Sequence, residues 1–238
     1  MLVKYWMKSE PITVSAETLV IDAQKIMRNH NIRRLPVLKG NKLIGIVTLS
    51  GLREAQPSKA TSLSIHELNY LLAKMTVGEI MTTDVITCSP DMTMEKAAVL
   101  GTKYGVGALP VVENGRLIGI ITESDIYRAF LHMLGATHKE SIRITLDNFP
   151  KEQDEIIRVI SILDGLKGTL VSLALVDDIP LEGRRELVFR VKNVDAEALV
   201  EQLQGHGYVV SNVSRIDLPD RELPANLKSS EVGRFYVG

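Results

Sequence analysis

A Gly-X-X-Thr-X-X-Asp segment, running from Gly119 to Asp125, ends an apolar stretch in the middle of the sequence. A carboxylate at Asp125 can accept hydrogen bonds from two adjacent hydroxyls at once, as on a ribose. Thr122 can donate to a phosphate, and backbone N–H groups at the start of a following helix are natural anion donors. Residues of these types can bind hydroxyl groups and an anion. Asp125 equally fits an ordinary helix N-cap, with Ser124 as a rival for that position.

A closely similar segment ends at Gly51, where the carboxylate is missing although Thr48 is kept. Glycine cannot hold ribose hydroxyls with a side chain, so we expect this cleft to be empty, weak or used for something else. Arg33-Arg34 stand here where the later segment has Gly107-Ala108. Because a guanidinium fork matches phosphate geometry, both arginines and Thr48 are candidate phosphate contacts. The alternative is a solvated basic pair, or a pair bound to an acidic neighbour.

Other chemistry has little support in the sequence. The five histidines lack the i,i+4 spacing and the cysteine companions of a metal site, and no known catalytic motif occurs. We therefore predict no metal site and no enzyme activity. The single cysteine, Cys88, lies in an apolar, strand-like run and is expected to be a buried, inert thiol.

The two segments belong to a duplicated module. Aligned without gaps at an offset of 74, residues 7–55 and 81–129 share 15 identities over 49 positions. Each copy predicts a short extended piece, a helix (17–29 and 91–104), two strands joined by a two-residue turn, and a final helix. Gly45 and Gly119 recur within the second strand of the hairpin. They mark either a kink or close packing there, or the close approach of a ligand.

The sequence pattern changes after the duplicated module. Residues 141–213 alternate as strand, helix, two strands, helix and strand, which is the βαββαβ order of a ferredoxin-like fold. We place the boundaries at 1–60 and 77–135 for the two copies, with a linker helix at 61–76. The third domain covers 141–213, and a polar tail covers 214–238. The predicted fold class is α+β.

The duplicated unit resembles a pair of CBS domains, known as a Bateman module. The residues that carry the resemblance are "IRRLPVLKGNKLIGIVTLSGL" and "VGALPVVENGRLIGIITESDI". The last domain resembles an ACT-type domain, and the CBS-CBS-ACT order resembles the acetoin-utilisation protein AcuB family. The resemblance implies two CBS domains packed about a pseudo-twofold axis, with the arginines of the first copy pointing into the shared cleft.

The resemblance also implies an adenine nucleotide as regulatory ligand, with no other cofactor. It places the adenine edge near the backbone of Ile86 and Val106 against the ring, while small residues before Pro110 leave room for the ligand. The nucleotide-binding candidates are Ile86, Val106, Gly107, Ala108, Pro110, Thr122 and Asp125. ACT domains that bind amino acids usually carry glycine after the proline of the first strand-helix turn, but here Lys151 follows Pro150. We therefore expect dimerisation through strands such as "TLVSLALV".

The favoured reading is a non-catalytic regulatory protein that senses AMP, ADP or ATP and relays the signal to the ACT-like domain or a partner. The alternatives are a dimerising scaffold with vestigial clefts, or a regulatory subunit of a metabolic enzyme such as one in acetoin utilisation. A net charge of −1 gives no general attraction to nucleic acid or membrane. The apolar runs fall short of the roughly 20 residues of a bilayer span. We expect a cytoplasmic homodimer.

Overall fold

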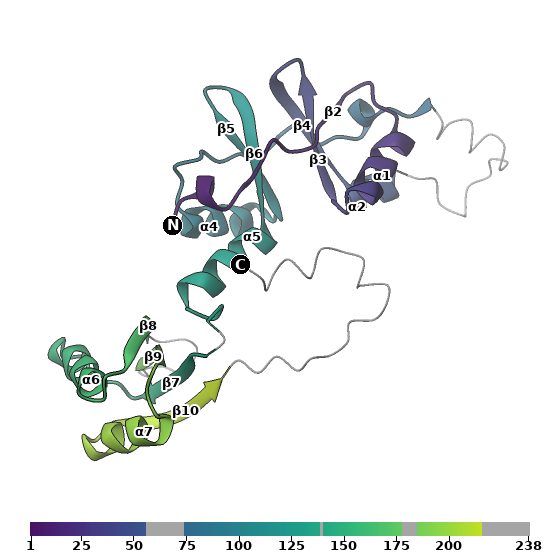
Figure 1. The fold of residues 1–238 in the computed structure, drawn as a ribbon. Coiled ribbons are helices and arrows are strands. Elements are labelled where there is room, and N and C mark those ends of the chain that lie inside the picture. The colour runs from purple at the N-terminus through teal and green to yellow at the C-terminus, as the bar shows by residue number, and fades with distance from the viewer. Residues whose placement is uncertain (56–73, 139, 178–184, 216–238) are drawn as a thin grey trace. The chain divides into compact units, whose positions relative to one another are not determined.

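The computed structural model describes residues 1–55, 74–138, 140–177 and 185–215. It contains two compact units, Met1–Ala129 and Phe130–Gly238 (Figure 1). The first unit holds the duplicated module, and the second holds the βαββαβ segment. The predicted linker helix at 61–76 lies almost wholly outside the described residues, as do most of the predicted tail and residues 178–184.

Both copies of the module form the predicted helices and hairpin in the predicted order, with further short elements ahead of them; the extended piece forms a strand in the first copy and a single bridge, Cys88 to Val111, in the second. In the first copy these are η1 (Val3–Tyr5), β1 (Lys8–Ser9), β2 (Val14–Ser15), α1 (Val20–Asn29), β3 (Arg34–Lys39), β4 (Lys42–Thr48) and α2 (Leu49–Glu54). In the second they are η2 (Val77–Glu79), α4 (Met94–Tyr104), β5 (Ala108–Glu113), β6 (Arg116–Thr122) and α5 (Glu123–Met133). The two helices expected at 17–29 and 91–104 begin three residues later than predicted, after Leu19 and Thr93 in extended conformation.

The hairpins turn where the sequence predicts them. Strand β3 pairs antiparallel with β4, and β5 pairs antiparallel with β6, with Arg34 opposite Thr48 and Ala108 opposite Thr122. Gly40 takes a φ of +60°, and Asn114 and Gly115 take +49° and +76°. Glycine and asparagine tolerate this left-handed region, which a tight hairpin turn requires.

The copies exchange their leading segments. Strand β1 of the first copy pairs with β6 of the second, with Lys8 opposite Ile120. Reciprocally, Thr82, ahead of the second copy, bridges to Ile46 of β4. A second reciprocal pair follows the same offset of 74, because Leu2 bridges Thr93 while Thr76 bridges Leu19. This reciprocity is the pseudo-twofold symmetry expected of the pair.

The exchange explains the repeated glycines. A Cβ added to Gly45 would lie 2.5 Å from Met81 Sδ, and one added to Gly119 would lie 2.5 Å from Met7 Sδ. At such distances something must move, and the backbone carbonyls of Thr82 and Lys8 also lie 3.1 Å from the added Cβ atoms, so each glycine packs closely against the other copy's leading segment. Of the two readings left open above, close packing is the correct one.

The second unit contains β7 (Ile142–Asp147), α6 (Asp154–Gly165), β8 (Thr169–Asp177), β9 (Arg185–Lys192), α7 (Ala196–Gly205) and β10 (Val209–Arg215). The strands form an antiparallel sheet in the order β10-β7-β9-β8. Strand β10 runs to Arg215, two residues past the predicted end of this element.

The core of this unit lies between the sheet and its two helices. Alternate residues of the central strands β7 and β9, including Ile144 and Phe189, pack with Leu163 of α6 and Leu203 of α7. This period of two leaves the other face of the sheet without those helices. That open face carries the polar residues Arg143, Thr145 and Arg190, among others.

Candidate functional site

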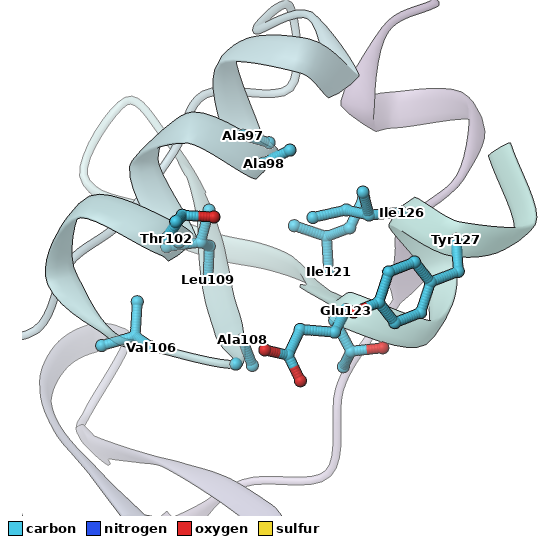
Figure 2. Close-up of a pocket in the computed structure, with 13 residues that line it drawn as sticks. Ala97, Ala98, Thr102, Val106, Ala108, Leu109, Ile121, Glu123, Ile126 and Tyr127 are labelled. Carbon is cyan, nitrogen blue, oxygen red and sulfur yellow. The ribbon is translucent and has the colours of Figure 1, made fainter. Parts of the chain in front are cut away.

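A pocket opens in the second copy between α4, β5, β6 and α5 (Figure 2). Its empty volume is about 450 Å³, which includes open solvent at its mouth. The lining is mostly apolar, and Glu123 is the charged group among it. We call it the second-copy pocket; it is lined by Ala97, Ala98, Gly101, Thr102, Val106, Gly107, Ala108, Leu109, Ile121, Thr122, Glu123, Ile126 and Tyr127.

Four of the predicted nucleotide contacts, Val106, Gly107, Ala108 and Thr122, come together in this pocket. Ile86, Pro110 and Asp125 are not among its lining residues. Pro110 is buried within β5, where its carbonyl accepts a hydrogen bond from the Cys88 N–H at 3.0 Å. Ile86 is half-buried in the segment that leads to this bond.

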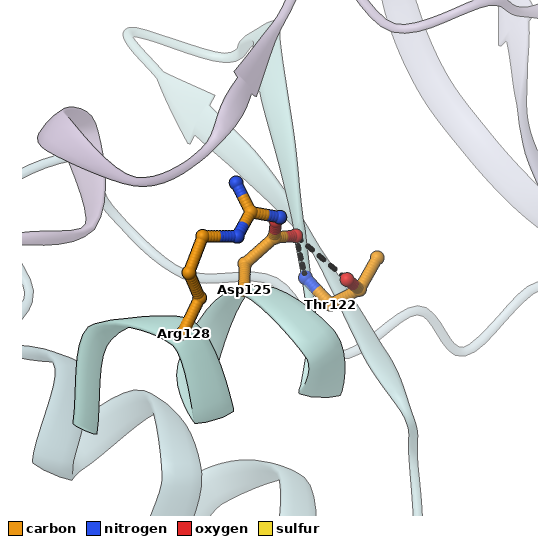
Figure 3. Close-up of polar contacts among 3 residues, drawn as sticks. All are labelled: Thr122, Asp125 and Arg128. Atoms are coloured by element: carbon orange, nitrogen blue, oxygen red, sulfur yellow. Dashed lines mark hydrogen bonds and ion pairs between the residues drawn. The ribbon is translucent and has the colours of Figure 1, made fainter. Parts of the chain in front are cut away.

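Asp125 is engaged by its own helix (Figure 3). Its Oδ2 accepts hydrogen bonds from the backbone N–H of Thr122 at 2.9 Å and from Thr122 Oγ1 at 2.6 Å. Its Oδ1 accepts from Arg128 Nη2 at 2.8 Å. Asp125 therefore caps α5 from the third helical position, like the acidic residue of a capping box, and not from the N-cap position. One acceptor position of the carboxylate, on Oδ1, is left for a ligand.

The space beside Gly107 is filled by a side chain of the first copy. A Cβ added to Gly107 would collide with Nη2 of Arg34 and would lie 3.0 Å from Oε2 of Glu123. The absence of a side chain at Gly107 thus admits a guanidinium, whereas the sequence predicted that it leaves room for a ligand. As expected from the resemblance, an arginine of the first copy does reach the cleft of the second.

The first copy has a pocket of its own, with an empty volume of about 840 Å³. We call it the first-copy pocket; it is lined by Arg33, Arg34, Thr48, Leu49, Ser50 and Arg53. Thr48 Oγ1 accepts a hydrogen bond from the N–H of Gly51 at 3.0 Å and lies 3.0 Å from Ser50 Oγ. Three arginines and no acid line it, so this pocket favours anions.

The two pockets occupy equivalent positions in the duplicated module, since five of the six residues that line the first-copy pocket correspond at the offset of 74 to residues that line the second-copy pocket, Ser50 being the exception. Arg33 and Arg34 correspond to Gly107 and Ala108, Leu49 to Glu123, and Arg53 to Tyr127. The copies have therefore diverged from one frame into a basic pocket and a mostly apolar, acidic one.

Among the lining residues that the sequence analysis missed, three carry a charge or an aromatic ring. Glu123 and Tyr127 enter the second-copy pocket one helical turn apart on α5, and Arg53 enters the other from α2. The signal was available in the repeat, because all three stand where the copies differ in charge or aromatic character. Tyr127 is 66% exposed, which for an aromatic ring at the mouth of a pocket leaves a face available for stacking.

Comparison with known proteins decides the family. A family model for the CBS domain matches residues 3–58 and 77–132. Uncharacterized protein MJ1426 of Methanocaldococcus jannaschii is 35% identical over 155 residues, covering 55% of this chain and 92% of that protein. The chain belongs to the CBS-domain family. The matched residues are the two copies, so the predicted CBS pair is confirmed.

Enzymes also contain related pairs. Inosine-5'-monophosphate dehydrogenase of Korarchaeum cryptofilum is 38% identical over 130 residues, or 54% of this chain. The chain spans 24% of that enzyme's length, and 23% of that of the L-aspartate semialdehyde sulfurtransferase of Methanocaldococcus jannaschii. The similarity therefore concerns their CBS-like portion.

Two solved structures are similar to part of this chain. The CBS domain pair of protein MJ0100, in complex with 5'-methylthioadenosine and S-adenosyl-L-methionine, is 33% identical with a TM-score of 0.46. It covers 55% of this chain and 95% of that one. A putative acetoin utilization protein (AcuB) from Vibrio cholerae is 31% identical with a TM-score of 0.48, covering 56% and 93%.

Two further features of the described residues bear on chemistry. They include no group of three or more His, Cys, Asp or Glu side chains placed to hold a metal ion, and no helix long and apolar enough to cross a membrane. Cys88 is 4% exposed, and burial raises the pKa of its thiol to about 11. The predicted buried thiol is confirmed, and it remains protonated at neutral pH.

Proposed function

We propose that this chain is a non-catalytic regulatory protein whose CBS pair senses an adenine nucleotide. The observation that carries the proposal is the second-copy pocket, which joins an apolar floor to the guanidinium of Arg34 from the other copy. An adenosine group needs the apolar floor, and a phosphate needs the guanidinium. CBS pairs commonly bind adenine nucleotides, so the family supports the same ligand class.

In this proposal the base lies against Val106 and Tyr127, and a ribose hydroxyl donates to the remaining acceptor position of Asp125. The phosphates extend toward Arg34 and the other lining residues of the first-copy pocket. Thr122 adds a hydroxyl at the same end of β6. One nucleotide would thereby contact both copies, and its differential affinity for two arrangements of the pair would produce the regulatory change.

For the second unit we propose a ferredoxin-like, ACT-type fold. The sheet order β10-β7-β9-β8 with both helices on one face supports this, because it is the order of a βαββαβ unit. Lys151 after Pro150 disfavours an amino-acid site, so edge strand β8 serves dimerisation. The nucleotide signal is relayed to this unit or to a regulated partner enzyme.

The experiment is a thermal-shift panel with AMP, ADP, ATP and GTP on the wild type and on Asp125→Ala. Because a ligand that binds the folded state raises its stability, an adenine-specific rise in Tm is expected in the wild type. That rise should shrink in Asp125→Ala. Equal shifts with all four nucleotides, or none, would favour the scaffold alternative.

A further inference from the structure

A row of polar side chains crosses the open face of the second unit's sheet. In the register of the strands, Ser214 of β10 is opposite Arg143 of β7, Arg143 is opposite Arg190 of β9, and Arg190 is opposite Ser172 of β8. We call these four residues the Ser-Arg row. Residues directly opposite in adjacent strands share a face, so the two arginines leave the same face of the sheet from opposite positions at its centre.

This placement is unfavourable for the protein alone. Like charges directly opposite in a sheet destabilise it, and burial of an uncompensated charge adds a further cost. Arg190 is 6% exposed, although arginine is rarely buried without a charged partner. Its pKa is lowered by burial and then by the charge of Arg143.

The contacts these arginines make are all to neutral oxygens. Arg190 Nη1 donates to Ser141 Oγ at 3.3 Å, and Arg143 Nη1 donates to Thr145 Oγ1 at 2.8 Å and to Asn212 Oδ1 at 3.4 Å. Within the parts of the second unit that the structure describes, neither arginine forms an ion pair with a carboxylate. Each guanidinium carries five N–H donors, so most of the donor capacity of the pair is left for another group.

We propose that the Ser-Arg row is a binding site for a small oxyanion, a carboxylate or a phosphate. A guanidinium fork matches the geometry of such a group, and the negative charge of the group offsets the repulsion between the two arginines. The hydroxyl of Ser214, at one end of the row, adds a further polar group. The site is on a sheet face of the second unit and is separate from both pockets of the CBS pair.

The row also holds the segment that follows α5. Ser172 Oγ donates to the carbonyl of Leu134 at 2.7 Å, and a Cβ on Gly135 would lie 3.4 Å from Arg190 Cδ. Ser141, the acceptor for Arg190, ends the same segment. An anion that takes the N–H groups of Arg190 would therefore compete with Ser141 and loosen this segment from the sheet.

The test titrates inorganic phosphate, and acetate in a parallel arm, into the full chain carrying Arg34→Ala, which weakens the first-copy pocket. Potassium chloride at matched ionic strength is the reference. The arginine Nε–Hε signals are followed by NMR, and Tm is measured in the same buffers. We expect the Arg143 and Arg190 signals to shift saturably and Tm to rise above the chloride reference with at least one anion.

Three variants make the result specific. Arg143→Gln should weaken the apparent affinity at least about tenfold, as should Arg190→Lys, which keeps the charge but loses the fork. Arg116→Gln, which removes the same charge at an exposed site, should leave it unchanged. The proposal is overturned if neither anion shifts the arginine signals or Tm beyond the chloride reference. It is also overturned if Arg143→Gln keeps the full anion affinity of the parent chain, or if Arg116→Gln loses as much anion affinity as Arg143→Gln. AMP binding plays no part in this outcome, so the nucleotide proposal stands or fails separately.

Discussion

At the scale of single residues, the two clefts are distinguished by a few side chains on a common frame. Both copies keep a threonine, Thr48 or Thr122, at the same position. The first copy has arginines where the second has small residues, and Leu49 where the second has Glu123. Sequence reasoning found the arginines because their chemistry is explicit in the residue type. It could not find that Asp125 is occupied by Thr122 and Arg128, because those bonds depend on how the first turn of α5 closes.

Glu123 should oppose the phosphate of a nucleotide. Its carboxylate reaches the space beside Gly107 that Arg34 also enters. We expect Glu123→Gln to raise the affinity for AMP about three- to tenfold and to leave that for adenosine nearly unchanged, since one like charge is removed. Calorimetry with both ligands measures the ratio, and Glu113→Gln at the end of β5 is the control. A gain equal for adenosine and AMP would contradict the charge argument.

Tyr208 gives the fold a dependence on alkaline pH. Burial, followed by the hydrogen bond of its hydroxyl to Glu155, raises its pKa to about 12. Since the folded state favours the neutral, protonated form, this contribution is complete below the ordinary pKa of about 10. It is lost as the pH rises from about 10 to about 12. Denaturant unfolding should show a steeper loss of stability over that window in the wild type than in Tyr208→Phe, whereas Tyr104→Phe should follow the wild type.

At the scale of elements, the order of strands and helices could be read from periodicity and from the repeat. The turns at Gly40 and Asn114-Gly115 were identifiable from residue type. The exchange of leading segments was not, because a two-residue strand such as Lys8–Ser9 has no period to detect. The same limit left the role of Gly45 and Gly119 open until their neighbours from the other copy were placed.

The exchange predicts the effect of filling a glycine. Gly119→Ala should lower the free energy of unfolding by about 1–3 kcal/mol, because the new methyl group meets Met7 Sδ and the Lys8 carbonyl. Gly119→Ala should lower the free energy of unfolding by less in a Met7→Ala background than it does in the wild type. Gly205→Ala at the end of α7 meets nothing within 4 Å and should be neutral or stabilising. A double-mutant cycle by denaturant unfolding measures the coupling, and strict additivity would exclude the contact.

At the scale of the whole molecule, the account describes a CBS pair in which one nucleotide is contacted by both copies. The resemblance to CBS pairs implied the ligand class. The structure then showed that the pocket of one copy is mostly apolar and that of the other is basic. The sequence could not show which arginine reaches the second copy or that its guanidinium lies beside Gly107, since residues 73 apart are brought together by the packing of two copies. The nucleotide's phosphate is therefore the group on which this account depends most.

The most direct measurement compares AMP with adenosine on the wild type and on Arg34→Ala by calorimetry. The guanidinium interacts with the phosphate and not with the nucleoside. We therefore predict that Arg34→Ala lowers the affinity for AMP about ten- to a hundredfold and changes the affinity for adenosine by less than about twofold. Arg28→Ala, on α1 and outside both pockets, is the matched control. Retention of AMP affinity in Arg34→Ala, or an equal loss for adenosine and AMP, would contradict the account.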